Sequence, residues 1–207
     1  MSERRGRLIA FEGIEGAGKS THLHLAAAAL RARGIPVIET REPGGTPLGV
    51  EIRRVLMHLT HTTPSPMAEL LLYLADRAQH LDEVIRPALA RGEVVLTDRF
   101  SASTIAYQGY ARRLDLDTVS RLDALVRGDV APVLTVLLDC PVAVGLGRAT
   151  GNDRFHREAM AFHEHVRAAF LEFARRDPER YCVIDASASS AQVQHDVMAA
   201  LLRCLEP

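Results

Sequence analysis

A glycine-rich segment near the N-terminus has the residues and the spacing of a phosphate-binding loop. Residues 13–20 read Gly-Ile-Glu-Gly-Ala-Gly-Lys-Ser, which fits the pattern G-x-x-x-x-G-K-[ST]. The glycines let backbone N–H groups turn inward around phosphates, the lysine can reach the β- and γ-phosphates, and the final hydroxyl can bind Mg²⁺. We therefore expect a nucleoside triphosphate site, with Lys19 catalytic and Ser20 a metal ligand, formed by Gly13, Ile14, Glu15, Gly16, Ala17, Gly18, Lys19, Ser20 and Thr21.

A carboxylate and a guanidinium stand side by side at the end of an apolar run. Asp98 and Arg99 follow Val-Val-Leu-Thr at residues 94–97. Ligands of parallel sheets bind beyond the carboxyl ends of the strands, so both side chains should lie near the phosphate loop. Asp98 is then a candidate Mg²⁺ ligand, directly or through water, and Arg99 a clamp for a phosphate. The alternative is that Asp98 and Arg99 form an ion pair with only a structural role at the end of the strand. The nearby phosphate loop favours the binding role over this alternative.

The elements that must position these residues alternate along the chain. Short apolar runs predict strands at Leu8–Glu12, Val37–Thr40, Val94–Asp98, Leu134–Asp139 and Cys182–Asp185, and longer helical patterns separate them. This alternation predicts an α/β fold, with a doubly wound, mostly parallel five-stranded sheet flanked by helices. Arg-Gly pairs at 33–34, 91–92 and 127–128 indicate helix ends, and Ser189 with Gln192 indicates a capping box for the last helix.

Length, charge and cysteine content narrow the class of protein. The 207 residues suit one domain, which we expect to span residues 1–207. A net charge of −1, from 25 basic and 26 acidic residues, argues against a nucleic-acid partner. The three cysteines argue against a disulfide framework and favour the cytoplasm. No stretch approaches the ~20 apolar residues of a membrane span, so we expect no membrane partner.

The phosphate loop alone does not separate kinases from GTPases and ATPases. No Asn-Lys-x-Asp sequence occurs, so the usual guanine-reading element of regulatory GTPases is missing. The chain is also short for a motor ATPase.

Three further segments follow the phosphate loop in order. They read Thr-Arg-Glu-Pro-Gly-Gly-Thr at 40–46, Asp-Arg-Ala-Gln-His at 76–80 and Asp-Arg-Phe-Ser-Ala-Ser-Thr-Ile-Ala-Tyr-Gln-Gly at 98–109. Over nearly its whole length the chain resembles bacterial thymidylate kinases, which belong to the superfamily of P-loop nucleoside monophosphate kinases. The resemblance implies transfer of the γ-phosphoryl group of Mg²⁺-bound ATP to dTMP, giving dTDP for dTTP biosynthesis. It also implies a homodimer.

The resemblance implies the acceptor site as well. Arg99 would hold the phosphate of dTMP as a catalytic residue, and Arg77 would meet the thymine edge or the phosphates. Tyr107 would fill the space beside C2′ of the sugar. The residues implied to bind dTMP are Glu15, Glu42, Pro43, Tyr73, Arg77, Arg99, Thr104, Tyr107 and Gln108.

Glu15 indicates the branch of this family in which the catalytic arginines come from a lid. The lid would span residues 148–157, with Arg148 and Arg154 as catalytic candidates and Arg157 nearby. This segment is shorter than in relatives, and Tyr73 stands where a phenylalanine is usual. Two alternatives therefore stay open. One is a kinase for another deoxynucleotide or a modified pyrimidine monophosphate, and the other is a nucleotide-binding module that has lost catalysis.

Overall fold

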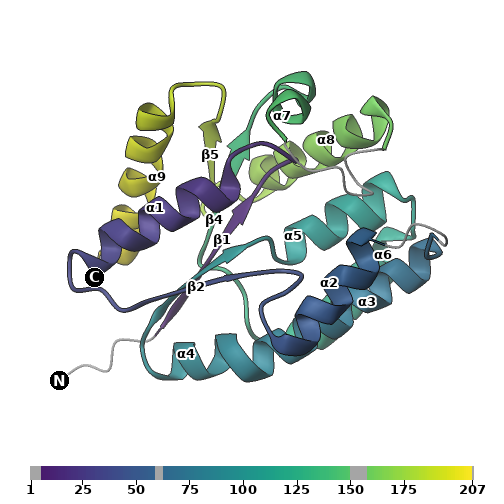
Figure 1. Ribbon diagram of the computed structural model, residues 1–207, viewed down its shortest axis with the longest axis horizontal. Helices are drawn as coiled ribbons and strands as arrows, with labels where there is room; N and C mark the ends of the chain where they lie inside the picture. Colours follow the sequence, from purple (N-terminus) through teal and green to yellow (C-terminus); the bar gives the residue numbers. More distant parts are fainter. Residues whose placement is uncertain (1–5, 59–62, 150–157, 207) are drawn as a thin grey trace.

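Parallel strands form the centre of the molecule in the computed structural model, which describes residues 6–58, 63–149 and 158–206 (Figure 1). The strands are β1 (Arg7–Glu12), β2 (Val37–Arg41), β3 (Val94–Asp98), β4 (Leu134–Asp139) and β5 (Tyr181–Asp185). Their order is β2-β3-β1-β4-β5, and each pairing between neighbours is parallel. The predicted five-stranded α/β fold is confirmed, and each strand lies within one residue of its predicted bounds.

Helices connect the strands and cover the sheet. The α-helices are α1 (Lys19–Arg31), α2 (Pro47–His58), α3 (Pro66–His80), α4 (Arg86–Ala90), α5 (Ser101–Thr104), α6 (Leu116–Arg127), α7 (Val142–Arg148), α8 (Met160–Arg176) and α9 (Ser190–Leu205). The π-helical segment η1 (Leu81–Ile85) joins α3 to α4, and η2 (Ile105–Ala111) extends α5. Among the described helices, none combines the length and the apolar composition needed to cross a bilayer.

Side chains of β1 alternate between the two faces of the sheet. Ile9 and Phe11 belong to the core cluster that includes the buried side of α1, whereas Leu8 and Ala10 pack with residues of η1 and α4. Helices α1 and α9 contact each other and lie side by side in Figure 1. Because helices cover both faces, consecutive residues of the central strands β1, β3 and β4 are buried, and these strands read as apolar runs.

The strand register brings the two predicted phosphate-binding segments to the same edge of the sheet. Phe11 of β1 lies opposite Asp98 of β3, and Glu12 lies opposite Leu137 of β4. The phosphate loop follows β1 and Arg99 follows β3, so both leave the sheet at its carboxyl edge. This is the edge at which open α/β sheets bind ligands.

The predicted helix ends are also present. The glycines of the three Arg-Gly pairs, Gly34, Gly92 and Gly128, have φ of 74°, 75° and 61°. Ser189 Oγ accepts a hydrogen bond from the backbone N–H of Gln192 at 3.3 Å and caps α9. The return half of the expected capping box does not form, because the Gln192 side chain donates to Asp196.

Candidate functional site: a phosphate loop and three neighbouring cavities

The phosphate loop lies between β1 and α1, and Lys19 is the first residue of the helix. Lys19 Nζ is buried and donates hydrogen bonds to the carbonyl oxygens of Gly13 at 3.1 Å and Ile14 at 2.8 Å. Burial, and secondarily the charge of Arg99, lowers the pKa of Lys19 to about 8. The lysine is therefore held in the loop by weak carbonyl partners that a phosphate can replace.

The loop is packed tightly against α7. A Cβ atom on Gly145 would lie 2.5 Å from the carbonyl oxygen of Glu15, well inside van der Waals contact. Of the loop residues predicted to bind the nucleotide, Ile14 is 2% exposed and its side chain belongs to the core. Contact with the nucleotide thus falls to the loop backbone and to the polar side chains.

The two predicted metal ligands lie together at the carboxyl edge of the sheet. Ser20 Oγ donates a hydrogen bond to Asp98 Oδ2. A hydroxyl and a carboxylate oxygen suit Mg²⁺, which keeps several waters and takes phosphate oxygens as further ligands. Within the described ranges, no group of three or more His, Cys, Asp or Glu side chains could hold a metal ion unaided. The residues present therefore fit a Mg²⁺ ion that arrives with a nucleotide.

Arg99 reaches from the end of β3 to the phosphate loop. Its Nη1 donates to Gly13 O at 3.1 Å and to Ser103 Oγ at 2.9 Å, and its Nη2 lies 3.1 Å from Glu15 Oε1. The guanidinium also stands over the Tyr107 ring, 5.0 Å from its centroid. Burial opposes the charge of Arg99, but Tyr107, Glu15 and other acidic neighbours raise its pKa above the usual value. Arg99 has φ of 74°, a strained value for a residue with a side chain, and such strain is concentrated at functional sites.

Glu12, which the sequence analysis did not single out, holds the turn that carries Arg99. It is completely buried, and Oε1 accepts from the backbone N–H groups of Phe100 at 2.9 Å and Ser103 at 3.2 Å. Its Oε2 accepts from Ser103 Oγ at 2.6 Å. Burial raises the pKa of Glu12. The sequence feature that could have identified Glu12 is a carboxylate at the end of an apolar strand, directly before the phosphate loop.

Arg77 is almost completely buried and is already paired. Its Nη2 lies 2.7 Å from Glu42 Oε2, and its Nη1 lies 2.5 Å from Asp123 Oδ1. The other oxygen of Glu42 lies 2.9 Å from His80 Nδ1. Two carboxylates therefore neutralise the guanidinium of Arg77.

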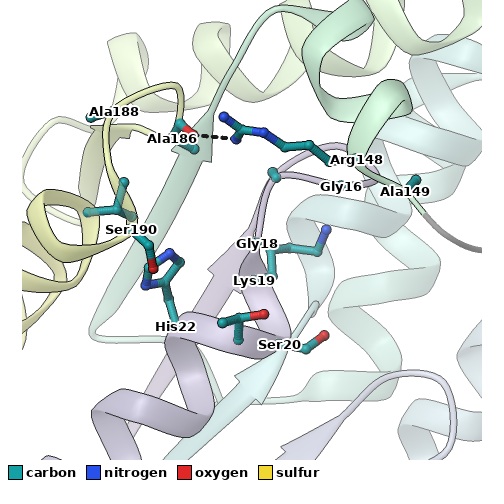
Figure 2. Close-up of a pocket in the computed structure, with 13 residues that line it drawn as sticks. Gly16, Gly18, Lys19, Ser20, His22, Arg148, Ala149, Ala186, Ala188 and Ser190 are labelled. Atoms are coloured by element: carbon teal, nitrogen blue, oxygen red, sulfur yellow. Dashed lines mark hydrogen bonds between the residues drawn. The ribbon is translucent and has the colours of Figure 1, made fainter.

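The first of three cavities opens beside the phosphate loop and has a volume of about 540 Å³. Its walls are residues 16–22, Arg148, Ala149, Ala186, Ala188, Ser190 and Val193. Arg148 Nη1 donates to Ala186 O at 2.6 Å, and Figure 2 shows the side chain reaching across the cavity toward Ala186. Arg148 is thus placed in the wall of this cavity. Arg154, Arg157 and the rest of the predicted lid after Ala149 lie outside the described residues.

The second cavity, of about 200 Å³, lies at the carboxyl edge of β2 and β3. It is lined by Glu15, Gly16, Lys19, Ser20, Arg41, Glu42, Arg53, Asp98, Arg99 and Ala149. The sequence analysis missed Arg41 and Arg53, which join Arg99 here. Arg53 Nη1 donates to Pro43 O at 3.1 Å, so Pro43 helps to place a cation. Arg41 belongs to the 40–46 segment, whereas nothing local marks Arg53 on α2.

The third cavity is small, about 30 Å³, and its walls combine aromatic rings with polar and charged side chains. It is lined by Glu42, Tyr73, Arg77, Arg99, Phe100, Ser103, Thr104, Tyr107 and Gln108. Tyr107 donates its O–H to Glu15 Oε1 at 2.6 Å. Gln108 donates to the buried Glu69 at 2.8 Å, which orients its amide. Most residues predicted to bind the acceptor are therefore gathered here.

Each of the three cavities shares lining residues with the next one. The first and second have Gly16, Lys19, Ser20 and Ala149 in common, and the second and third share Glu42 and Arg99. Cationic side chains are concentrated in the middle cavity. The arrangement can hold two phosphate-bearing molecules end to end, with their phosphates meeting between Lys19 and Arg99.

Comparisons with known proteins agree with this geometry. The model of the family described as thymidylate kinase matches residues 11–197. The thymidylate kinase of Pseudomonas fluorescens is 52% identical over 204 residues, 97% of each chain, and that of Geobacter sulfurreducens is 51% identical over 189 residues, 87% of this chain and 89% of that one. A crystal structure of thymidylate kinase from Ehrlichia chaffeensis has a TM-score of 0.77 at 34% identity and covers 95% of this chain and 98% of its own. The chain belongs to the thymidylate kinase family.

Proposed function

We propose that this chain carries out the reaction of its family, the transfer of the γ-phosphoryl group of ATP to dTMP to give dTDP. The observation that carries the proposal is the series of three neighbouring cavities, with the phosphate loop between the first and second and Arg99 between the second and third. ATP occupies the first cavity, and dTMP occupies the second and third.

The donor phosphates lie along the loop. Lys19 exchanges its hydrogen bonds to the loop carbonyls for hydrogen bonds to the β- and γ-phosphates. The N-terminus of α1 adds the positive end of its dipole. Ser20 and Asp98 would hold the Mg²⁺ ion of MgATP. When bound, the ion neutralises the charge that develops on the transferred group.

The acceptor phosphate lies in the second cavity, facing Arg53 and Arg99. A monophosphate ester has a second pKa near ~6, so it is largely dianionic at neutral pH and needs no general base. Phosphoryl transfer passes through a loose transition state, so the protein contributes alignment and cancellation of charge. These arginines and Lys19 supply both.

The nucleoside of the acceptor lies against the walls of the third cavity, which must widen to admit it because its present volume is about 30 Å³. Tyr107 is held there by its bond to Glu15 and by edge contacts with Phe162 and Phe170, whose ring centroids are 6.0 and 6.5 Å away. A ring held in this way fills the space beside C2′ and disfavours a ribose. Thr104 and Gln108 present polar groups to the base, and Tyr73 and Arg77 complete its walls.

We assign different roles to the two arginines of the predicted lid. Arg148 binds the donor, because it lies in the wall of the first cavity. Arg154 is our candidate for the cation that reaches the transferred phosphoryl group when residues 148–157 close as a lid.

We further propose that residues 1–207 act as a single domain in a cytoplasmic homodimer. All three cysteines are free, which suits a reducing compartment. Met67 and Leu71 stand one turn apart on α3 and are 39% and 51% exposed, which suits a contact between subunits.

An acceptor-dependent ADP-release assay tests the proposal. At saturating MgATP, dTMP, dUMP, dCMP, dAMP, dGMP and the ribose counterpart of dTMP are compared. We expect the highest kcat/KM for dTMP and a clear preference for the deoxy sugar. A higher kcat/KM for another nucleotide would indicate a kinase with a different acceptor. Binding of ATP without release of ADP for any acceptor would indicate a binding module.

A further inference from the structure

His163 on α8 is a buried polar side chain that the proposed mechanism does not use. It is completely buried, and within the described part of the chain neither ring nitrogen has a hydrogen-bond partner. Its Nδ1 nevertheless lies 3.2 Å from Oε2 of Glu15, and that oxygen is also buried without a hydrogen bond. Buried polar groups are nearly always paired, so two orphaned atoms facing each other need an explanation.

The other oxygen of Glu15 is fully engaged in the acceptor site. Oε1 accepts from the Tyr107 hydroxyl at 2.6 Å and from Arg99 Nη2 at 3.1 Å. A carboxylate is planar, so whatever holds Oε2 also determines the direction of Oε1. The orientation of this one carboxylate therefore controls both the phosphate clamp and the ring beside the sugar.

We propose that His163 is a positioning residue of the acceptor site, acting on Arg99 and Tyr107 through Glu15. The inference rests on the acceptor-site roles proposed above for these two residues. Nδ1 carries the hydrogen, because a nitrogen lone pair facing a carboxylate oxygen would be repelled. The separation of 3.2 Å between Nδ1 and Oε2 is within hydrogen-bond range.

This contact also joins the phosphate loop to the helix that follows residues 150–157. α8 begins at Met160, and His163 lies in its first turn. The ring is packed edge-on against Phe162, with centroids 5.5 Å apart, so the imidazole has little room to adopt another direction. The start of α8 and the acceptor site are thereby linked through Glu15.

Three substitutions separate positioning from packing. Asparagine places its amide nitrogen near the position of Nδ1, glutamine places it near Nε2, and phenylalanine keeps the ring without either nitrogen. We expect His163→Phe to raise KM for dTMP by about tenfold or more, as expected when a buried charged group loses its partner. It should also narrow the preference for dTMP over its ribose counterpart, with KM for ATP changed less than about twofold.

His163→Asn should keep most of the affinity and the sugar preference, whereas His163→Gln should resemble the phenylalanine variant. His165→Asn is the matched control, because His165 is exposed on the same helix. A packing role would lower the melting temperature of all three His163 variants without changing the sugar preference. If the phenylalanine variant does not fold, the asparagine and glutamine variants carry the comparison.

Glu15→Ala distinguishes this inference from the proposed function. If Glu15→Ala changes KM for dTMP and the sugar preference but His163→Phe does not, the acceptor site stands and the positioning role is wrong. Equal losses in the asparagine and glutamine variants would also overturn the role. If Glu15→Ala changes neither quantity, the proposed acceptor site itself fails, and the inference fails with it.

Discussion

Gly16 of the phosphate loop and Gly145 of α7 are in backbone contact so close that a Cβ atom on Gly16 would lie 1.8 Å from Gly145 O. The contact also runs the other way, since a Cβ atom on Gly145 would lie 2.5 Å from Glu15 O and 2.9 Å from Ile14 Cδ1. The position of the phosphate loop is therefore determined partly by a helix far away in the sequence.

Gly145→Ala should displace the loop and reduce kcat/KM for both substrates. Backbone cannot move aside as a flexible side chain can, so we also expect a loss of stability of about 1–3 kcal/mol. Gly147→Ala is the matched control on the same helix, because nothing lies within 4 Å of an added Cβ atom there. It should leave activity unchanged and stability equal or slightly higher. Steady-state kinetics and thermal unfolding of the two variants check this, and equal effects would show that the contact is unimportant.

Lys19→Ala should abolish phosphoryl transfer and leave the fold intact. The ammonium group donates its hydrogen bonds to the loop carbonyls of Gly13 and Ile14, so we expect its removal to change the loop and not the sheet. Circular dichroism and ADP release measure the two properties. Near-normal turnover would remove the assignment of the phosphate loop.

The pH dependence of the unmodified protein should report the same lysine. Its pKa in the folded protein is lowered to about 8, so the nucleotide-free protein loses this charge as pH rises through 8. We expect kcat/KM for MgATP to fall above that pH, because this ratio reports ionisations of the free enzyme. The unfolded chain holds the proton up to about pH 10.4, so folding stability should rise with pH between these values. A flat kcat/KM profile from pH 7 to 9.5 would contradict the expectation.

Arg53→Ala should raise KM for dTMP by about tenfold or more, with a smaller change in KM for ATP. Arg53 lies in the middle cavity with Arg99, and hydrogen bonds to charged groups contribute about 1.5–3 kcal/mol. Its neighbour Arg54 is exposed and paired with Glu51, and such surface pairs contribute at most about 1 kcal/mol. Arg54→Ala should therefore behave like the unmodified protein. Similar KM values for dTMP in both variants would exclude Arg53 from the acceptor site.

Arg148→Ala and Arg154→Ala should affect different kinetic constants. Arg148 lies in the donor cavity, so its removal should raise KM for ATP with little change in kcat. Arg154 lies outside the described residues, and we predict from its place in the sequence that its loss lowers kcat with little change in KM. Arginine fingers contribute about 10³–10⁵ in rate, and several lid cations can share that effect. Full kcat in both single variants would assign the chemistry to Arg157 or to another group.

Asp76→Asn should remove a destabilising charge at neutral pH. Asp76 Oδ1 accepts from the backbone N–H of Gly44 at 2.9 Å, and burial together with the charge of Glu42 raises the pKa of Asp76 to about 6. Between its ordinary pKa near 3.8 and 6 the folded protein binds more protons than the unfolded chain, so stability falls as pH rises. A shift of this size corresponds to about 3 kcal/mol at most.

Urea unfolding at pH 4.5 and pH 7 checks this prediction. The asparagine variant mimics the protonated carboxyl, so it should gain stability over the unmodified protein at pH 7 and much less at pH 4.5. A difference that does not depend on pH would show that Asp76 titrates normally.

Local patterns in the sequence were sufficient for the framework. The apolar runs at residues 8–12 and 94–98 predicted strands, and the glycine and lysine spacing at 13–20 predicted the phosphate loop, because periodicity and turn chemistry act between near neighbours. The adjacency of Ser20 and Asp98 also followed, since parallel strands end at one edge of the sheet.

Distances between remote segments could not be read in the same way. Arg53 joins Arg99 only because α2 packs beside the 40–46 segment, and Arg77 proves to be neutralised by Glu42 and Asp123. Glu15 and His163 meet only after α8 has packed against the sheet. Such contacts depend on how whole helices pack against the sheet. The residues next to a side chain in the sequence do not determine which distant charged group it will contact.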